Sequence, residues 1–315
     1  MRPTPRAAGR MASGGAAQEE AAAMADDDTD ELARLLEDAE RKLGMGEVEP
    51  AARLLEEAGF LALDDDAPAP KRRLAALLAG LGDQRLSAGA TPAAIESYRA
   101  ALSLMSAVAD GAPEEAAAQR ERAFLRYRLG AAELAAGRRE QALERFEVGT
   151  REIETLSEAA PEHPGYRRDL SASRSMLGDA LTELGQRERA LTAYRSALAL
   201  AEEVDGAASE AAPAQLYMAT LHRRIGALLE AAGETAAAIE SVQRQAGVLE
   251  SFRRLGAADA ALQKELIEAY RRLARLAPGE AKGPLAAAID VAQSLPPPGD
   301  PALAAALRLE MKALE

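Results

Sequence analysis

Cysteine and tryptophan are absent from this 315-residue chain, and histidine occurs only twice. The lack of cysteine excludes disulfides, thiolate chemistry and cysteine-ligated zinc, and it fits a reducing cytoplasm. Aromatic residues make up 3% of the chain, whereas hydrophobic residues make up 48%. The core must therefore consist mainly of Ala and Leu, which favour helices over strands. We predict an all-α, cytoplasmic protein.

Long apolar runs are absent as well, since no stretch approaches the roughly 20 residues that a membrane-spanning helix needs. We therefore expect no membrane partner. Residues 1–27 are rich in Gly, Pro and small side chains and carry Arg2, Arg6 and Arg10. This composition predicts a disordered N-terminal segment. Two alternatives stay open: an organelle transit peptide, or a true start at Met11 or Met24.

The formal net charge of −13 is concentrated near the N-terminus. Residues 19–66 hold 17 acidic side chains against four basic ones, residues 1–18 contribute +3, and the rest sums to −3. No basic face is available to neutralise phosphates, so nucleic acid is excluded as a partner. The acidic stretch is interpreted as a solubilising cap, with a specific acidic docking segment as the alternative.

An internal repeat of 48 residues runs through the chain. Its anchor is Leu81-Gly82, which recurs as Leu129-Gly130, Leu177-Gly178 and Ile225-Gly226, with Leu273-Ala274 at the next multiple. Seven residues after each anchor glycine stand Gly89, Gly137, Gly185 and Gly233. Twelve residues after it stand Ala94, Ala142, Ala190 and Ala238, and sixteen after it stand Tyr98, Phe146, Tyr194 and Val242. Each unit is predicted to be a helix hairpin that is stable only when stacked on its neighbours.

Each repeated residue has a physical role in such a hairpin. The second glycine should end the first helix, because glycine adopts a left-handed conformation without steric cost. The anchor glycine should let two helices approach closely. We expect the alanine at the twelfth position to face that glycine, and the large residue at the sixteenth to fill the space between successive hairpins.

The pattern resembles the tetratricopeptide repeat over residues 71 to about 295. The third unit matches the family signature at Leu177, Gly178, Gly185, Ala190, Tyr194 and Ala197. The resemblance implies a right-handed superhelical solenoid of antiparallel helix hairpins with capping helices. The chain departs from the family pattern in two respects. Its period is 48 residues, whereas the usual period is about 34. The large aromatic that commonly stands four residues before the anchor glycine is replaced by Leu78, Arg126, Arg174 and His222.

The long period and the linkers are similar to repeat regions that follow the kinase domain in some bacterial serine/threonine kinases. The expected organisation is a disordered segment over 1–27, an acidic shortened first repeat or cap over 28–66, a solenoid of about five repeats over 67–295, and a C-terminal capping helix within 296–315.

Catalytic, cofactor and metal sites are not predicted. His163 lies between two prolines in a linker, and His222 lies in a repeat helix. The chain has no glycine-rich phosphate loop, no kinase motif and no cluster with metal-ligand spacing. We therefore expect no enzyme activity and no cofactor.

Function is expected on the inner surface formed by the first helix of each hairpin. Its candidate partner-binding residues are Tyr127, Ser175, Asp179, Arg223, Arg271 and Arg275. The groove reads as apolar early and basic late, so its partner would be a protein or peptide, with an acidic segment as one option. The leading hypothesis is a non-catalytic scaffold or adaptor. One alternative is a regulatory module acting in trans on a signalling enzyme such as a serine/threonine kinase. Another is an accessory subunit of an enzyme, or an enzyme whose site forms only on assembly.

Overall fold

Helices account for nearly all regular structure in the computed structural model, which describes residues 12–64, 67–205, 212–295 and 299–314. Within these ranges there are thirteen α-helices, one short 3-10 helix and no strand. The helices are α1 (Ala12–Gly44), α2 (Val48–Asp64), α3 (Pro68–Ser87), α4 (Thr91–Gly111), α5 (Ala116–Ala135), α6 (Arg139–Ala159), α7 (Pro164–Glu183), α8 (Arg187–Asp205), α9 (Ala212–Ala231), α10 (Thr235–Arg254), α11 (Ala260–Leu276), η1 (Pro278–Glu280), α12 (Lys282–Ser294) and α13 (Pro301–Lys312).

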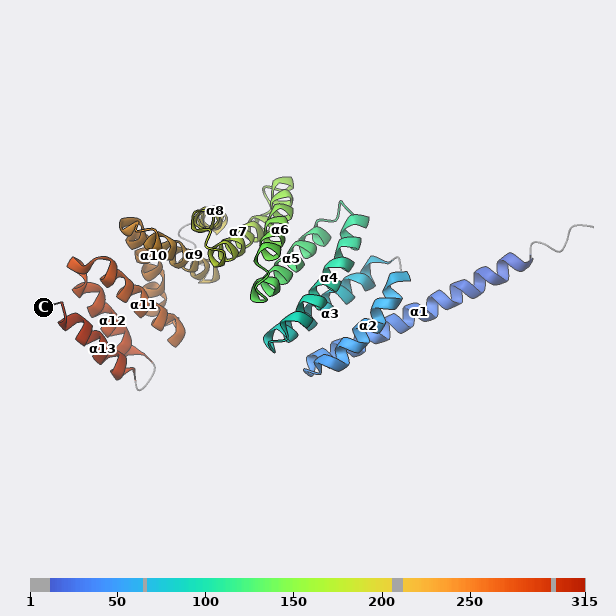
Figure 1. The fold of residues 1–315 in the computed structure, drawn as a ribbon, viewed down its shortest axis with the longest axis horizontal. Helices are drawn as coiled ribbons and strands as arrows, with labels where there is room; N and C mark the ends of the chain where they lie inside the picture. Colours follow the sequence, from blue (N-terminus) through green and yellow to red (C-terminus); the bar gives the residue numbers. More distant parts are fainter. Residues whose placement is uncertain (1–11, 65–66, 206–211, 296–298, 315) are drawn as a thin grey trace, which may run out of the picture. The chain divides into compact units, whose positions relative to one another are not determined.

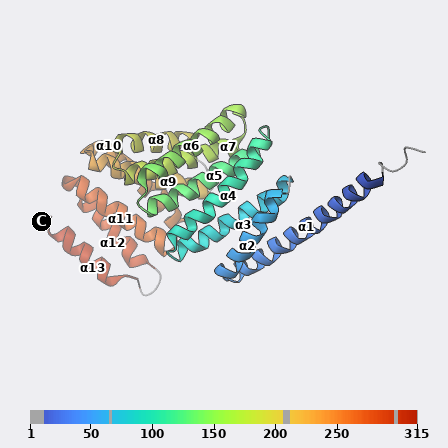
Figure 2. The ribbon, with the colours of Figure 1, turned by 45° about the vertical axis from the view of Figure 1, so that its right-hand side comes forward.

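The chain forms two units, residues 1–152 and 153–315, with the boundary inside α6. In the first unit α1 packs on α2 and α3 packs on α4, and the two hairpins lie side by side (Figures 1 and 2). In the second unit α7 packs on α8, α9 on α10, α11 on α12, and α12 on α13. The predicted all-α repeat of helix hairpins is confirmed.

The turn inside each of the first five hairpins, from α1–α2 to α9–α10, is set by its glycine. The five glycines at these turns have positive φ angles of 74–78°: Gly46, Gly89, Gly137, Gly185 and Gly233. After α3 the N–H of Gly89 donates to the carbonyl of Leu86 at 3.0 Å, and the N–H of Ala90 donates to the carbonyl of Arg85 at 2.8 Å. This pairing satisfies the last carbonyls of the first helix and reverses the chain into the second.

The anchor glycine contacts the large residue of its own hairpin, a contact that the sequence did not predict. A Cβ at Gly178 would lie 2.6 Å from the ring of Tyr194, and one at Gly82 would lie 2.6 Å from the ring of Tyr98. The ring at the sixteenth position therefore occupies the space that the missing side chain leaves. It also faces the next hairpin, as expected, because Tyr98 belongs to the same core cluster as Leu125 and Leu129 of α5. The alanine at the twelfth position is fully buried, as at Ala94 and Ala190.

Helical structure at the N-terminal end of the described chain differs from the prediction. Helix α1 extends back to Ala12, so residues 12–27 are helical where the sequence predicted disorder. Ala, Gln and Glu in this stretch are strong helix formers, which outweighs its glycines. Residues 1–11 lie outside the described residues, as do 296–298 before the C-terminal helix. At the C-terminal end, Ala304 and Leu307 of α13 join the core cluster of the last hairpin.

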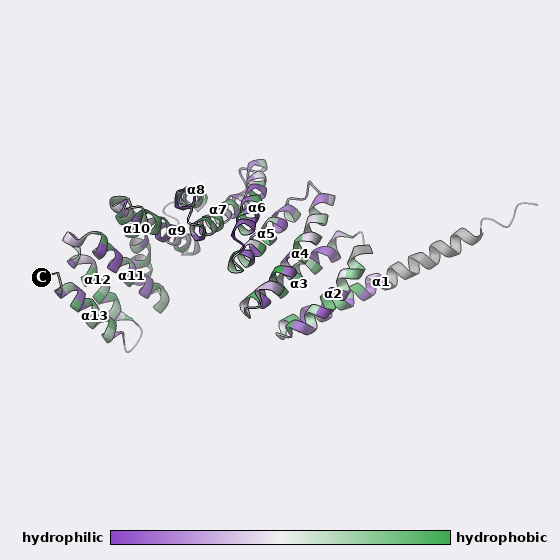
Figure 3. Cartoon of the chain, in the orientation of Figure 1, coloured by the Kyte–Doolittle hydropathy of each residue, from purple (hydrophilic) through white to green (hydrophobic). Residues whose placement is uncertain are grey.

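Hydrophobic and hydrophilic residues are mixed along the coloured parts of the helices (Figure 3), and every α-helix contributes buried hydrophobic side chains to the core. The core contains many alanines, which lets the helix axes approach closely. In the described residues no helix is both long and apolar enough to cross a membrane.

We predict that Gly178→Ala lowers the free energy of unfolding by about 1–3 kcal/mol, because the new methyl group displaces the Tyr194 ring. Gly247→Ala in α10 is the matched control, since a Cβ there meets no atom within 4 Å. This control should gain up to about 1 kcal/mol from helix propensity. Urea unfolding followed by circular dichroism measures both, and equal stability of the two variants would contradict the glycine–ring contact.

Candidate functional site

Tyr127, the first residue expected to face a partner, is buried inside the first unit. Its side chain is 3% exposed and its ring stacks on Phe146 with centroids 6.0 Å apart. Its hydroxyl donates to Thr150 at 3.4 Å. A Cβ at Gly149 would lie 2.9 Å from the ring, so this glycine makes room for it. Tyr127 thus contributes to the contact between α5 and α6.

Ser175 and Asp179 take part in a set of polar contacts between two hairpins of the second unit, which we call the polar clip. Arg224 of α9 donates to the hydroxyl of Ser175 at 2.6 Å and pairs with the carboxylate of Asp179 at 2.7 Å. The hydroxyl of Tyr194 donates to the same carboxylate at 2.6 Å. Burial and then the bond to Asp179 raise the pKa of Tyr194, so its phenol stays a hydrogen-bond donor.

The same clip occurs in the first unit, 96 residues earlier. Tyr98 donates to Asp83 at 2.7 Å, and Arg128 of the following hairpin pairs with Asp83 at 3.1 Å. In both places an arginine from one hairpin reaches the carboxylate beside the anchor glycine of the preceding hairpin. These polar residues on the first helices therefore hold neighbouring hairpins together.

The arginines expected to make the late part of the groove basic are mostly paired within the second unit. Arg223 pairs with Glu265 at 3.2 Å. Arg271 donates to both carboxylate oxygens of Glu310 in α13, at 2.6 and 3.3 Å. Arg275 is exposed and makes no ion pair or hydrogen bond with the residues that the structure describes. Arg275 is thus the one member of this expected set whose guanidinium is unpaired in the described chain.

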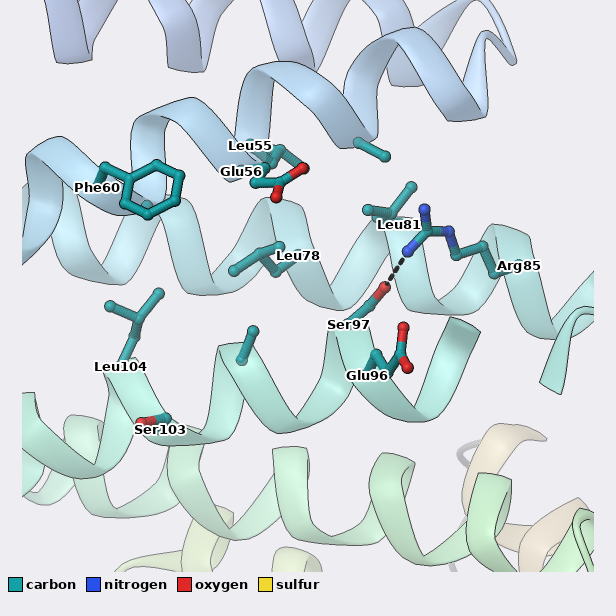
Figure 4. A pocket seen from close by; sticks show the side chains of 13 residues that line it. Leu55, Glu56, Phe60, Leu78, Leu81, Arg85, Glu96, Ser97, Ser103 and Leu104 are labelled. Carbon is teal, nitrogen blue, oxygen red and sulfur yellow. Dashed lines mark hydrogen bonds between the residues drawn. The ribbon is translucent and has the colours of Figure 1, made fainter. Parts of the chain in front are cut away.

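An open trough lies in the first unit, between the second helices of two successive hairpins (Figure 4). Its volume is about 550 Å³. Helices α2 and α4 form its walls and α3 forms its floor, as the close-up shows. Its apolar lining includes Leu55, Leu78, Leu81 and Leu104, and Phe60 at one end is 67% exposed. We call this feature the α2–α4 trough.

The trough is open because two of its residues differ from their equivalents 48 residues later. Leu78 and Leu104 correspond to Arg126 and Glu152. Arg126 donates to Glu152 at 3.0 Å, and the two side chains are only 17% and 16% exposed. That ion pair fills the space next to α6 with two long side chains, whereas the shorter leucines leave it open next to α4.

An arginine also pairs with a carboxylate at the next equivalent position, 96 residues after Leu78. Arg174 contacts the carboxylate of Glu154 and the hydroxyl of Ser196, so its guanidinium bridges α6 and α8. Arg126 and Arg174 thus form ion pairs where the family commonly has an aromatic, and Leu78 marks the one position of these three that lacks this pairing.

The charge at the α2–α4 trough is acidic. Glu56 of α2 and Glu96 of α4 point into it from opposite walls (Figure 4), and both are exposed without an ion pair to the described residues. Arg85, the basic residue in the lining, donates to Ser97 at 2.9 Å and pairs with Glu49 at 3.5 Å. Two carboxylates therefore face solvent beside an apolar floor.

Sequence reasoning missed this trough, although one signal could have pointed to it. Counted from the turn glycine of each hairpin, Phe60 corresponds to Ser103, Arg151, Ala199 and Gly247. An aromatic side chain that only the first hairpin carries, in a chain with so few aromatics, indicates a local role.

The two histidines occupy structural positions. The side chain of His163 accepts a hydrogen bond from the N–H of Tyr166 at 3.3 Å and so caps α7. Burial, followed by the nearby charge of Arg244, lowers the pKa of His222 to about 4, and Glu240 opposes this shift. Within the described residues no group of three His, Asp or Glu side chains is placed to hold a metal ion.

Comparisons with known proteins identify the fold. No protein-family model and no curated protein matches the chain. Solved structures do match, and one is BtubC (BKLC) from P. vanneervenii, with 20% identity, 87% of this chain and 92% of that chain covered, and a TM-score of 0.57. A Podosopora anserina protein with nearly identical TPR-like repeats has 19% identity, 71% and 97% coverage, and a TM-score of 0.50.

A third match is a signal transduction ATPase with numerous domains from Pyrococcus horikoshii, which has a tetratricopeptide repeat sensor. It shares 15% identity over 89% of this chain and 38% of that chain, with a TM-score of 0.57. The chain therefore has the tetratricopeptide-type helical repeat fold. The narrower resemblance to repeat regions of bacterial kinases stays a prediction.

Because Arg271 joins α11 to α13, we predict that Arg271→Glu lowers the free energy of unfolding by about 1 kcal/mol. Arg275→Glu makes the same charge change on the same helix at an exposed site and should leave stability unchanged. The exchange of charges in Arg271→Glu with Glu310→Arg should recover most of the loss. Thermal unfolding measures all three, and equal melting temperatures for the two single variants would contradict the pairing.

His222 should make the protein less stable in acid. Its folded-state pKa is about 4, below the usual value of about 6.5, so the unfolded chain binds the proton more tightly. The stability contributed by neutral His222 is full above pH 6.5 and is lost as the pH falls towards 4, by about 1–3 kcal/mol.

His222→Leu, which places the residue found at position 78, should remove this component while keeping the acid sensitivity of the carboxylates. The measurement is the difference in unfolding free energy between parent and variant from pH 7 to pH 4. Parallel curves for the two proteins would show that His222 does not couple folding to protons.

Proposed function

We propose that this chain is a non-catalytic scaffold that binds a protein or peptide in the cytoplasm. The observation that carries the proposal is the α2–α4 trough, which has an apolar floor and the exposed Phe60 at one end. Exposed apolar surface of this kind is typical of sites where a partner docks. The stacked-hairpin fold supports the proposal because it presents long surfaces without any need for chemistry.

The first-helix surface remains a second candidate for the docking site. It would hold a partner through exposed groups such as Arg275 and the partly exposed Arg223. An acidic partner segment would have to compete with Glu265 for Arg223 and with Glu310 for Arg271. This competition favours the trough, where no internal partner must be displaced.

A selection of randomised 12-residue peptides on the immobilised full chain tests the proposed function. We expect a defined sequence motif to be enriched over a folded control protein of similar net charge, with dissociation constants near or below about 100 μM by fluorescence anisotropy. If no motif is enriched, the proposal of a peptide-binding scaffold is contradicted.

A regulatory module acting in trans on a signalling enzyme is the second candidate function. It is favoured by the likeness to the Pyrococcus horikoshii signal transduction ATPase, in which a tetratricopeptide repeat serves as the sensor. The same binding surfaces would then contact an enzyme. Addition of the purified chain to a signalling enzyme encoded beside it, such as a serine/threonine kinase, should change the rate of that enzyme, and an unchanged rate would argue against this candidate.

A further inference from the structure

We propose that the α2–α4 trough binds a partner segment in which an arginine side chain stands next to large apolar residues. The inference rests on the proposed function, because it names the chemistry of the peptide that the scaffold would hold. It places the arginine between Glu56 and Glu96, and the apolar side chains on the leucine floor towards Phe60.

The first step of the argument is shape. The trough has an apolar floor from α3 and walls from α2 and α4, and its volume of about 550 Å³ holds several side chains. Phe60 is 67% exposed at one end, and Leu104 lies on the opposite wall at the same end (Figure 4). An apolar partner side chain at this end would shield the aromatic ring from water, at about 25 cal/mol per Å² of apolar surface removed from solvent.

The second step is charge. Glu56 and Glu96 face the trough without ion pairs to the described residues, while the guanidinium of Arg85 already contacts Ser97 and Glu49. In the sequence, residues 19–66, which include α2, carry 17 acidic side chains against four basic ones. A cationic partner is therefore attracted and an acidic one repelled.

The third step is a comparison of Leu78 with the residues at the equivalent positions of the later repeats. Arg126 and Arg174 stand 48 and 96 residues after Leu78, and each donates to a carboxylate on a second helix, Glu152 and Glu154 respectively. The first unit has leucine at this position and two unpaired carboxylates nearby. A guanidinium supplied by a partner would restore the arginine–carboxylate pairing that the later units make internally, and its fork geometry suits carboxylates better than a lysine ammonium does.

The test compares peptide binding by variants of the full chain. Leu78→Arg supplies from within the guanidinium that the partner is proposed to bring, whereas Ala76→Arg adds the same charge at an exposed position of α3 outside the trough. Peptides enriched on the parent protein are synthesised with a fluorescent label, and their affinities are measured by anisotropy. We expect an enriched motif with arginine beside large apolar residues, at least about tenfold weaker binding by Leu78→Arg, and a change within about twofold for Ala76→Arg.

Two further variants keep the test decisive if Leu78→Arg disturbs folding. Phe60→Ser introduces the residue found at the equivalent position 103 and changes an exposed side chain, so the fold is retained while apolar contact is lost. Glu56→Gln with Glu96→Gln should weaken binding and flatten its salt dependence, because the charge attraction is removed. Glu57→Gln with Glu114→Gln changes two exposed carboxylates outside the trough and is the matched control.

The outcomes separate this inference from the proposed function. Enrichment of acidic peptides, or of peptides that bind the trough variants as tightly as the parent, would overturn the inference and leave the scaffold proposal standing. Failure to enrich any peptide would contradict the scaffold itself. Loss of binding in the trough variants, with binding retained in the two control variants, supports the inference and the scaffold proposal together.

Discussion

The close contact between an anchor glycine and the large side chain sixteen residues later is the constraint on which this structure depends. At Gly178 even a methyl group would lie 2.6 Å from the Tyr194 ring, so the two helices of the hairpin are fixed at a separation that only glycine permits. That separation also brings the tyrosine hydroxyl to Asp179, whose carboxylate receives Arg224 from the next hairpin. One contact within a hairpin therefore positions the polar clip between hairpins.

Arginine pairing then determines which surfaces remain available. On the first helices, Arg224, Arg223 and Arg271 are paired with carboxylates of neighbouring elements, which makes these residues part of the stacking. On the side of the second helices, Arg126 fills the space that Leu78 leaves open 48 residues earlier. The repeat thus creates equivalent spaces in each unit, and the residue at one position decides whether such a space is filled internally or exposed to a partner.

Much of the fold could be predicted from the sequence, because 48-residue spacing and turn glycines are local signals. The left-handed conformation of the turn glycines follows directly from backbone preferences. The candidate site could not be predicted to the same degree. Spacing places Tyr127 and Arg271 on a helix face, but it cannot show that one packs against Phe146 and the other pairs with a residue 39 positions away. Whether a side chain is free depends on tertiary neighbours, and those require the three-dimensional structure.

The central claim is that the first unit exposes the α2–α4 trough for docking because Leu78 stands where the next repeat has Arg126. Hydroxyl-radical footprinting of the full chain with and without a selected peptide tests this claim. The oxidation rate of Phe60, which is 67% exposed in the free protein, reports directly on occupancy of the trough. The account predicts that the peptide protects Phe60 and leaves the exposed Leu255 and Leu309 of the second unit unchanged. Protection confined to the helices of the second unit, with Phe60 oxidised at the same rate, would contradict it.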